Sequence, residues 1–211
     1  WQAEWRNNAT GAQMEAIVDW GDALLSKTYT SSSIVRIETT LKQDATIAGV
    51  TDTMTAYRMA LLSGSQTTEL QGTDGTTIAS PTRNVFAINA RPKIEKIPTG
   101  GGADTVVFDK AVYEGFGVSE EGGGGSTVVS TKYGAELNVA GSIVYGYNFR
   151  LSSVTGVPNK AGQYRITFSL DPQATVGTET VPNHVTMVSK SDAGATLATD
   201  GLSSSVVITV N

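Results

Sequence analysis

The chain has 211 residues, a formal net charge of −5 and a charged fraction of 17%, without a basic stripe that would argue for nucleic acid as a partner. No run approaches the roughly 18 consecutive apolar residues that a membrane helix needs, so we expect no membrane span in this sequence. The absence of cysteine excludes disulfides and thiolate metal sites.

Residues 1–20 are predicted to form an N-terminal arm and a first strand. Alternating apolar residues from Met14 through Val18 to Trp20 favour a strand over the helix that 12–20 would also permit. The aromatic pair Trp1 and Trp5 can cover one end of its own core, or it can lie across a neighbouring subunit and complete that subunit's sheet. The start at Trp1 instead of methionine suggests processing, with a trimmed end as the alternative.

Weaker alternation predicts strands within 29–41, 54–62 and 85–97. Proline and glycine cluster in the loop 98–104, which is where a division into two sub-domains would fall. Because no internal repeat spans that loop, we expect residues 21–211 to form a single composite domain.

The clearest strands lie in the second half of the chain. Large apolar groups share one face at Tyr145, Tyr147, Phe149 and Leu151, and the same pattern returns from Tyr164 to Leu170. The turn-rich segment 157–162 joins these two runs, which predicts an antiparallel hairpin. Pro172 should end the second strand, because proline donates no backbone hydrogen bond.

The last alternating stretches are 185–188 and 206–210. Val206, Ile208 and Val210 share a face opposite Val207 and Thr209, and this segment carries no charge. Many short strands with frequent turns predict an all-β fold, an antiparallel β-sandwich of immunoglobulin-like or jelly-roll-like type. Both ends of the chain look strand-like and carry little charge, so they leave sheet edges that can pair with another chain.

The sequence contains none of the usual catalytic motifs that we would recognise from residue types and spacing. His184 is the only imidazole, and the pattern Gly-x-Ser-x-Gly is absent. The glycine run 122–125 leads into an apparent strand and lacks the lysine of a phosphate loop. Glu114, Glu120 and Glu121 lie beside that run, where a rigid catalytic frame is not expected. We therefore predict no enzyme, no catalytic residues and no cofactor.

No zinc-like ligand set is present, and we predict no metal site. Calcium alone stays open, because aspartates lie in turns and calcium accepts oxygen ligands from loops. Such aspartates more often bond their own backbone. The aspartates concerned are Asp44, Asp52, Asp74, Asp104, Asp109, Asp171, Asp192 and Asp200.

The leading hypothesis is a secreted structural subunit that polymerises with copies of itself into an extracellular filament, tube or surface lattice. The residues predicted to take part in assembly are Trp1, Trp5, Met14, Val18, Trp20, Val206, Ile208 and Val210. Asn8 begins an N-glycosylation pattern, which agrees with an extracellular or cell-surface location.

The alternative hypothesis is a carbohydrate-binding or adhesin-like module. It would present aromatic rings as stacking platforms for glycans. The tyrosines that would serve are Tyr133, Tyr145, Tyr147 and Tyr164, although alternation places the last three in a core more simply. A third hypothesis, an enzyme of the glycosidase or metal-assisted hydrolase type, would need two convergent carboxylates in a rigid pocket.

Overall fold

The fold was analysed in a computed structural model of the chain. The structure describes residues 2–5, 14–21, 24–44, 57–63, 66–71, 82–84, 87–115, 134–137, 143–176, 178–192 and 194–211. Strands dominate the described residues, and the helical elements among them are two short 3₁₀ turns, η1 (Val112–Gly115) and η2 (Leu151–Ser153). No helix in this part of the chain has the length and apolar character to cross a membrane.

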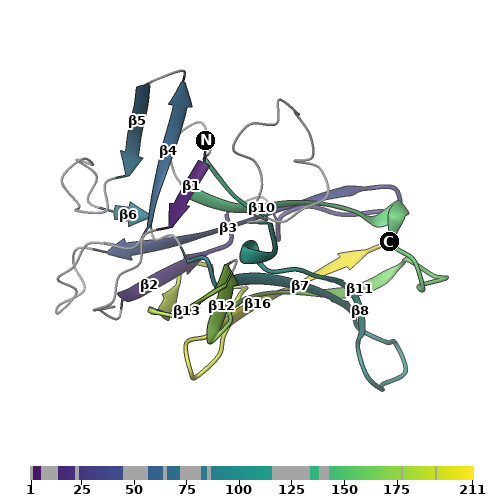
Figure 1. The fold of residues 1–211 in the computed structure, drawn as a ribbon. Helices are drawn as coiled ribbons and strands as arrows, with labels where there is room; N and C mark the ends of the chain where they lie inside the picture. Colours follow the sequence, from purple (N-terminus) through teal and green to yellow (C-terminus); the bar gives the residue numbers. More distant parts are fainter. Residues whose placement is uncertain are drawn as a thin grey trace.

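Two sheets form the body of the molecule (Figure 1). The first sheet has the order β14-β2-β3-β10-β9, with β6 paired to β3. Its strands are β2 (Met14–Asp19), β3 (Ile34–Asp44), β6 (Thr82–Asn84), β9 (Gly134–Leu137), β10 (Ile143–Arg150) and β14 (Val185–Lys190). The second sheet has the order β15-β16-β11-β7-β8. Its strands are β7 (Ala90–Lys96), β8 (Thr105–Asp109), β11 (Gly162–Leu170), β15 (Thr196–Leu197) and β16 (Ser203–Val210).

Two smaller sheets complete the described strands. A three-stranded sheet has the order β1-β4-β5, and a two-stranded one pairs β12 with β13. Their bounds are β1 (Gln2–Trp5), β4 (Tyr57–Ser63), β5 (Gln66–Gln71), β12 (Gln173–Val176) and β13 (Glu179–Pro182). The predicted all-β sandwich is therefore confirmed, as are strands within 14–20, 29–41, 54–62, 85–97, 185–188 and 206–210.

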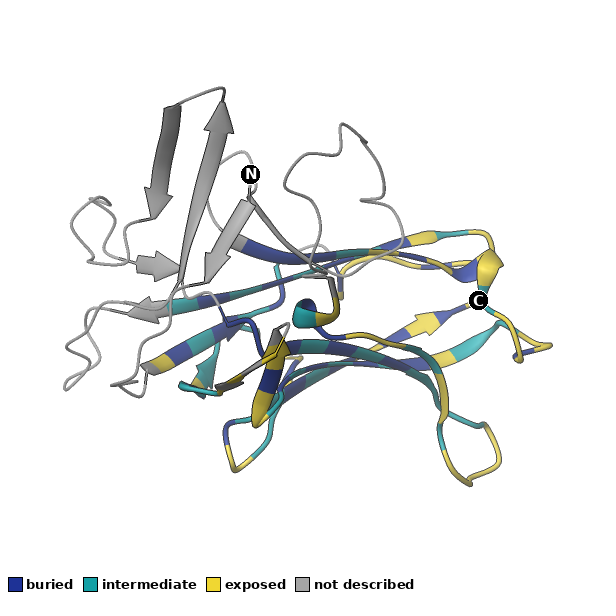
Figure 2. Cartoon of the chain, in the orientation of Figure 1, coloured by how far each residue is buried: buried dark blue, intermediate teal, exposed yellow. Residues whose placement is uncertain are grey.

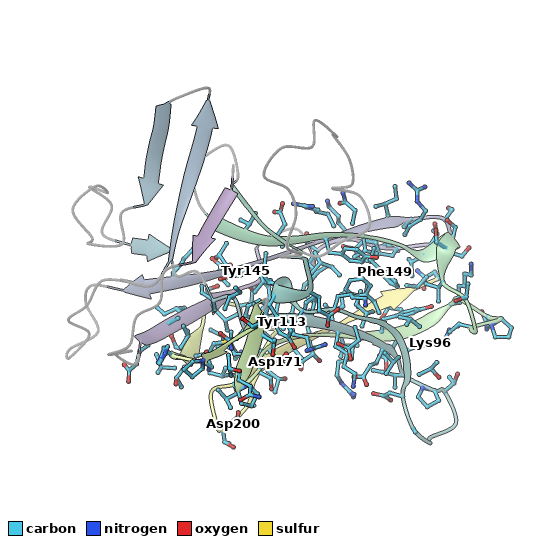
Figure 3. The ribbon with its side chains drawn as sticks, viewed as in Figure 1. Lys96, Tyr113, Tyr145, Phe149, Asp171 and Asp200 are labelled. Carbon is cyan, nitrogen blue, oxygen red and sulfur yellow. The ribbon has the colours of Figure 1, made fainter. Side chains whose placement is uncertain are left out.

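The core lies between the two main sheets, because each strand turns alternate side chains toward the other layer (Figure 2). In β11 every second residue from Tyr164 to Leu170 is buried. Across the layers, the rings of Tyr145 and Phe168 lie 5.2 Å apart, and those of Phe149 and Tyr164 lie 6.1 Å apart (Figure 3). The predicted apolar faces are thus real, and they pack against each other.

The predicted hairpin between the two clearest strands is wrong. β10 pairs with β3 and β9, whereas β11 pairs with β16 and β7, so the two strands belong to opposite sheets. In a hairpin, both apolar faces would lie on the same side of one sheet and would need a further cover. The segment 151–161 instead carries the chain across to the other layer, and each face covers the other.

The remaining pairings are mostly antiparallel, with one long-range exception. β14 pairs with β2 in parallel, with Val185 opposite Met14. At the end of β2, the Trp20 indole is 1% exposed, and its Nε1–H donates to Ser204 Oγ of β16 at 2.9 Å. This bond links the first sheet to the second and satisfies the one polar atom of a buried ring. β11 ends at Leu170, two residues before Pro172, in agreement with the predicted end of this strand.

The turn between β15 and β16 approaches β14 closely. Gly201 has φ +69°, a left-handed conformation that favours glycine, and its carbonyl accepts a hydrogen bond from the Met187 N–H at 2.8 Å. A Cβ atom at Gly201 would lie 2.5 Å from Thr186 Cγ2 and 2.7 Å from Met187 O. Glycine is therefore required at this position for space as well as for conformation.

We predict that Gly201→Ala destabilises the protein more than Gly156→Ala does. Gly156 has a similar φ of +73° but nothing within 4 Å of the added Cβ, so it reports the conformational cost alone. Gly156→Ala should cost roughly 1–2 kcal/mol, and Gly201→Ala about 1–3 kcal/mol more because of overpacking. Urea titration of both variants measures the difference; equal losses would contradict the close contact with β14.

Candidate functional site

The first candidate site is an open strand edge on β10. β9 pairs with β10 only from Ile143 to Gly146. The Leu151 N–H donates to Ser33 O, which lies on the β3 side of β10. Backbone groups of successive residues in a strand face opposite sides, so the N–H and C=O groups of Asn148 and Arg150 face away from β3. Among the described residues, no strand pairs with β10 at these two positions on that side.

A hollow of about 410 Å³ lies beside this edge. Val107 of β8, Tyr147 and Phe149 of β10, and Val154 contribute apolar groups to its wall. The ring of Tyr147 stacks on that of Phe108 with centroids 4.0 Å apart, and burial raises the pKa of the Tyr147 hydroxyl. The hollow therefore reaches from the edge of β10 into the space between the two sheets.

The second candidate site is a shorter open edge on β16. β15 pairs with Ser204 and Ser205, and Tyr29 forms a parallel bridge with Val210. The N–H of Asn211 donates to Tyr29 O at 2.8 Å, on the side of β16 that faces away from β11. Backbone groups of every second residue in a strand face the same side, so the N–H and C=O of Val207 also face away from β11. A hollow of about 220 Å³ lies here, lined in part by Leu25, Lys27 and Val207.

Exposed large apolar side chains gather beside these two edges. Among the described residues they are Leu25, Ile34, Val106, Val188 and Val207. Ile34, 49% exposed, lines the β10 hollow, and Leu25 and Val207 line the β16 hollow. Val106 precedes a residue that lines the β10 hollow. Three of the five thus line one of the two hollows, whereas Val106 and Val188 lie on β8 and β14, end strands of the two main sheets.

The predicted assembly residues fall into two groups. The side chains of Val18, Trp20, Val206, Ile208 and Val210 are all buried in the chain's own core. β2 is paired on both sides, by β14 and β3, so of these strands only β16 can contact a neighbour through its backbone edge and through outward-facing residues such as Val207. The backbone of Met14 in β2 pairs with that of β14, and the backbone of Trp5 in β1 pairs with that of β4. Trp1 and Asn8 lie outside the described residues.

The aromatics proposed as glycan platforms lie mostly inside the sandwich. Tyr145 and Tyr164 are both fully buried, and their hydroxyls bond to backbone groups at Ala87 N and Lys160 O. Tyr147 is partly exposed at the β10 hollow. Tyr133 lies outside the described residues.

The densest polar cluster is centred on Arg91. Its Nε donates to both carboxylate oxygens of Asp171 at 2.9 and 3.0 Å, and its Nη1 donates to Asp109 Oδ1 at 2.7 Å. Tyr113, which lies close to Asp171 in Figure 3, accepts from Nη2 and donates to Asp171 at 3.2 Å. Burial alone would lower the pKa of Arg91, but these carboxylates raise it. The cluster ties η1 and β8 to β7.

The described aspartates proposed for calcium have other partners. Asp104 pairs with Arg165, and Asp109 and Asp171 pair with Arg91. Asp192 accepts from the Trp20 N–H at 3.0 Å, and Asp200, at the loop tip in Figure 3, accepts from the Leu202 N–H at 2.9 Å. The side chains of Asp44, Asp52 and Asp74 lie outside the described set.

Catalytic and metal-binding groups do not converge in the part of the chain that is described. No three metal-ligating side chains gather there. His184 Nδ1 is buried and has no hydrogen-bond partner among the described residues, so no described carboxylate bonds to this nitrogen. Glu114 pairs with Lys110 at 3.2 Å, and Glu120 and Glu121 lie outside the described ranges.

The candidate residues that the sequence did not single out lie beside the two hollows: Asn148, Arg150, Ile34 and Leu25. Asn148 and Arg150 occupy the polar positions of a strand that was correctly predicted. Among the described residues β9 pairs with β10 only as far as Gly146, and the extent of such a pairing has no local signal in the sequence. Comparison with known proteins finds no matching family model, no matching curated protein and no matching solved structure.

We predict that Asp171→Asn destabilises the protein more than Asp109→Asn. Asp171 is 19% exposed and accepts from both Arg91 and Tyr113, whereas Asp109 is 40% exposed. The first substitution should cost about 1–3 kcal/mol, and the second less than about 1 kcal/mol because water screens an exposed pair. Urea titration of the two variants measures both; an equal loss would show that Asp171 does not anchor the cluster.

A second prediction concerns the contribution of Asp19 to the unfolding free energy at acid pH. Burial would raise the pKa of this carboxyl, but hydrogen bonds from Lys42 and the Gly21 N–H, with the charge of Lys42, lower it from 3.8. Because the pKa of Asp19 is lower in the folded state than in the unfolded state, its ionised carboxylate stabilises the protein at pH values above 3.8. This contribution is lost as the pH falls through the folded-state pKa.

The unfolding free energies of the wild type and Asp19→Asn should therefore converge as the pH falls below 3.8. Urea titrations across this range measure the convergence. In a Lys42→Met background the same comparison should depend on pH much less. A difference that stays constant down to about pH 2 would contradict the assignment.

Proposed function

We propose that this chain is a structural subunit that assembles with copies of itself by β-strand addition. The observation that carries the proposal is the part of the β10 edge that no described strand covers, with the apolar hollow beside it. Unpaired backbone donors and acceptors at a sheet edge bind an extended segment, and a pocket beside the edge takes that segment's alternate side chains. Both parts are present at Asn148 and Arg150.

The surface around the edges supports the same proposal. Natural proteins usually protect sheet edges with charged side chains, prolines or bulges. Here the β10 hollow is bordered by the exposed Ile34, and the β16 hollow by the exposed Leu25 and Val207. Exposed apolar side chains beside open edges favour contact with another chain.

Two different edges on one molecule also favour an extended assembly. The β10 edge lies on the β9 side of the first sheet, and the β16 edge lies on the β15 side of the second. Contacts made by unlike surfaces generate rings or open filaments. A filament, tube or surface lattice outside the cell is thus the form that we propose for the assembly.

Assembly is tested with purified full-length chain by light scattering over a range of concentrations and by electron microscopy. We expect concentration-dependent polymers. Ile34→Lys should weaken assembly about tenfold or more, because it places a charge beside the β10 hollow. Val188→Lys is the matched control, since Val188 is 40% exposed but lines neither hollow.

A chain that stays monomeric at all concentrations and salt conditions would overturn the proposal. An equal effect of Ile34→Lys and Val188→Lys would show that assembly does not use the β10 edge.

Carbohydrate binding is the second candidate function, and Tyr147 is the observation that favours it. Its ring is partly exposed at a hollow that also contains the polar side chains of Asn148 and Arg150. Sugars stack on aromatic rings and bond to such polar groups. A glycan array probed with wild type and Tyr147→Ala separates the two functions, since assembly without glycan binding leaves only the first.

A further inference from the structure

We infer that the hollow beside β10 is a binding site for a sugar that carries a carboxylate, a uronic acid. The inference rests on the second candidate function, carbohydrate binding, and names the class of sugar. The ligand occupies the hollow itself, with its ring against Tyr147 and its carboxylate paired with Arg150.

Arg150 differs from the other arginines whose side chains the structure describes. Arg36, Arg91 and Arg165 each form an ion pair with a carboxylate of the chain itself. Arg150 is exposed, and its guanidinium forms no ion pair or hydrogen bond with any described residue. A guanidinium is a planar set of donors that can give a carboxylate two parallel hydrogen bonds. Arg150 is therefore available to a carboxylate that comes from outside the chain.

Three further polar side chains line the same hollow, and none of them has a hydrogen-bond partner among the described residues. They are the amide of Asn148 and the hydroxyls of Ser153 and Thr155, and all three residues are exposed. Amides and hydroxyls both donate and accept hydrogen bonds, as the hydroxyl groups of a sugar do. The hollow thus offers hydrogen-bonding groups that the described part of the chain does not itself use.

The turn that carries Ser153 is fixed by the fold. Leu151, the first residue of η2, is fully buried, and its N–H donates to Ser33 O at 3.1 Å. The Val154 N–H closes the turn by donating to Leu151 O at 3.2 Å. Polar groups on a fixed turn need little ordering when a ligand binds, which favours binding.

Tyr147 provides an aromatic surface at the hollow. Its ring is held by stacking on Phe108, with centroids 4.0 Å apart, and Val107 and Val154 extend the apolar wall. The C–H groups of a sugar ring pack against such a wall, while its polar groups bond to the side chains at the rim. Burial raises the pKa of the Tyr147 hydroxyl, so this group stays uncharged beside a carboxylate.

The size and the charge of the hollow agree with one acidic sugar ring. Its volume of about 410 Å³ falls within the range of about 300–1,000 Å³ that is usual for ligand sites. Its described lining residues include no aspartate or glutamate, so a bound carboxylate meets no like charge among them. Because the chain as a whole has a net charge of −5, its overall field does not attract anions, and a preference for an acidic sugar depends on Arg150.

The test compares methyl glucuronide with methyl glucoside, which share a ring and differ in the carboxylate. Each is titrated into the full-length chain labelled with ¹⁵N, and NMR shifts give the dissociation constant and the residues affected. The glucuronide should bind at least about tenfold more tightly, because it adds a charged hydrogen-bonded pair. The shifted amides should include those of Asn148, Ser153 and Thr155.

Arg150→Gln should remove the preference for the glucuronide and leave weak binding of both sugars. Lys27→Gln is the matched control, since it removes the same charge from an exposed side chain beside the β16 hollow, and it should retain the preference. Acetate has the carboxylate without the ring and should bind at least about tenfold more weakly than the glucuronide, since it lacks the apolar contact with Tyr147.

The outcomes separate the two levels of the proposal. If neither sugar binds, the second candidate function fails and the inference fails with it. If both sugars bind equally, or if the preference persists in Arg150→Gln, the inference is overturned and carbohydrate binding stands. Equal binding of acetate and glucuronide would also overturn it, because the site would then accept any carboxylate, including that of an acidic peptide. Shifts confined to residues away from the hollow would exclude this site.

Discussion

The packing of two apolar sheet faces against each other is the interaction on which the rest of this structure depends. Tyr145 and Phe149 of β10 contact Phe168 and Tyr164 of β11 across the layers. Around this centre every second residue of β3, β11 and β16 is buried, and Trp20 adds a hydrogen bond between the sheets through Ser204. Loops, turns and the Arg91 cluster lie at the margins of that contact and adapt to it.

The open edges follow from the same packing. A sandwich holds together when its faces are covered, and this condition does not require strands of equal length or edges that are paired throughout. Among the described residues, β9 pairs with β10 from Ile143 to Gly146, and β15 pairs with β16 at Ser204 and Ser205. Short stretches of β10 and β16 then have no described partner strand and lie beside apolar hollows. These stretches are the candidate sites for partner binding.

Period-two alternation predicted most strands and the buried faces of β10, β11 and β16, because burial on one face leaves a direct mark on the sequence. It did not predict that β10 and β11 would face each other, since alternation tells which side of a strand is apolar but not which sheet the strand joins. The turn aspartate Asp200 bonds its own backbone, which local sequence does indicate. The edge at Asn148 and Arg150 depends on where β9 ends, and the Arg91 cluster joins residues 80 positions apart, so neither leaves a local pattern.

The parallel pairing of β14 with β2 also affects the order in which this chain acquires its structure. The two strands are separated by most of the sequence, so a ribosome must synthesise residue 190 before the first sheet can close along that side. Closing so large a loop has an entropic cost that grows slowly with length, but contacts of this range delay folding. Until β14 has been synthesised, β2 therefore lacks its partner on that side, and its backbone groups there can pair with other chains.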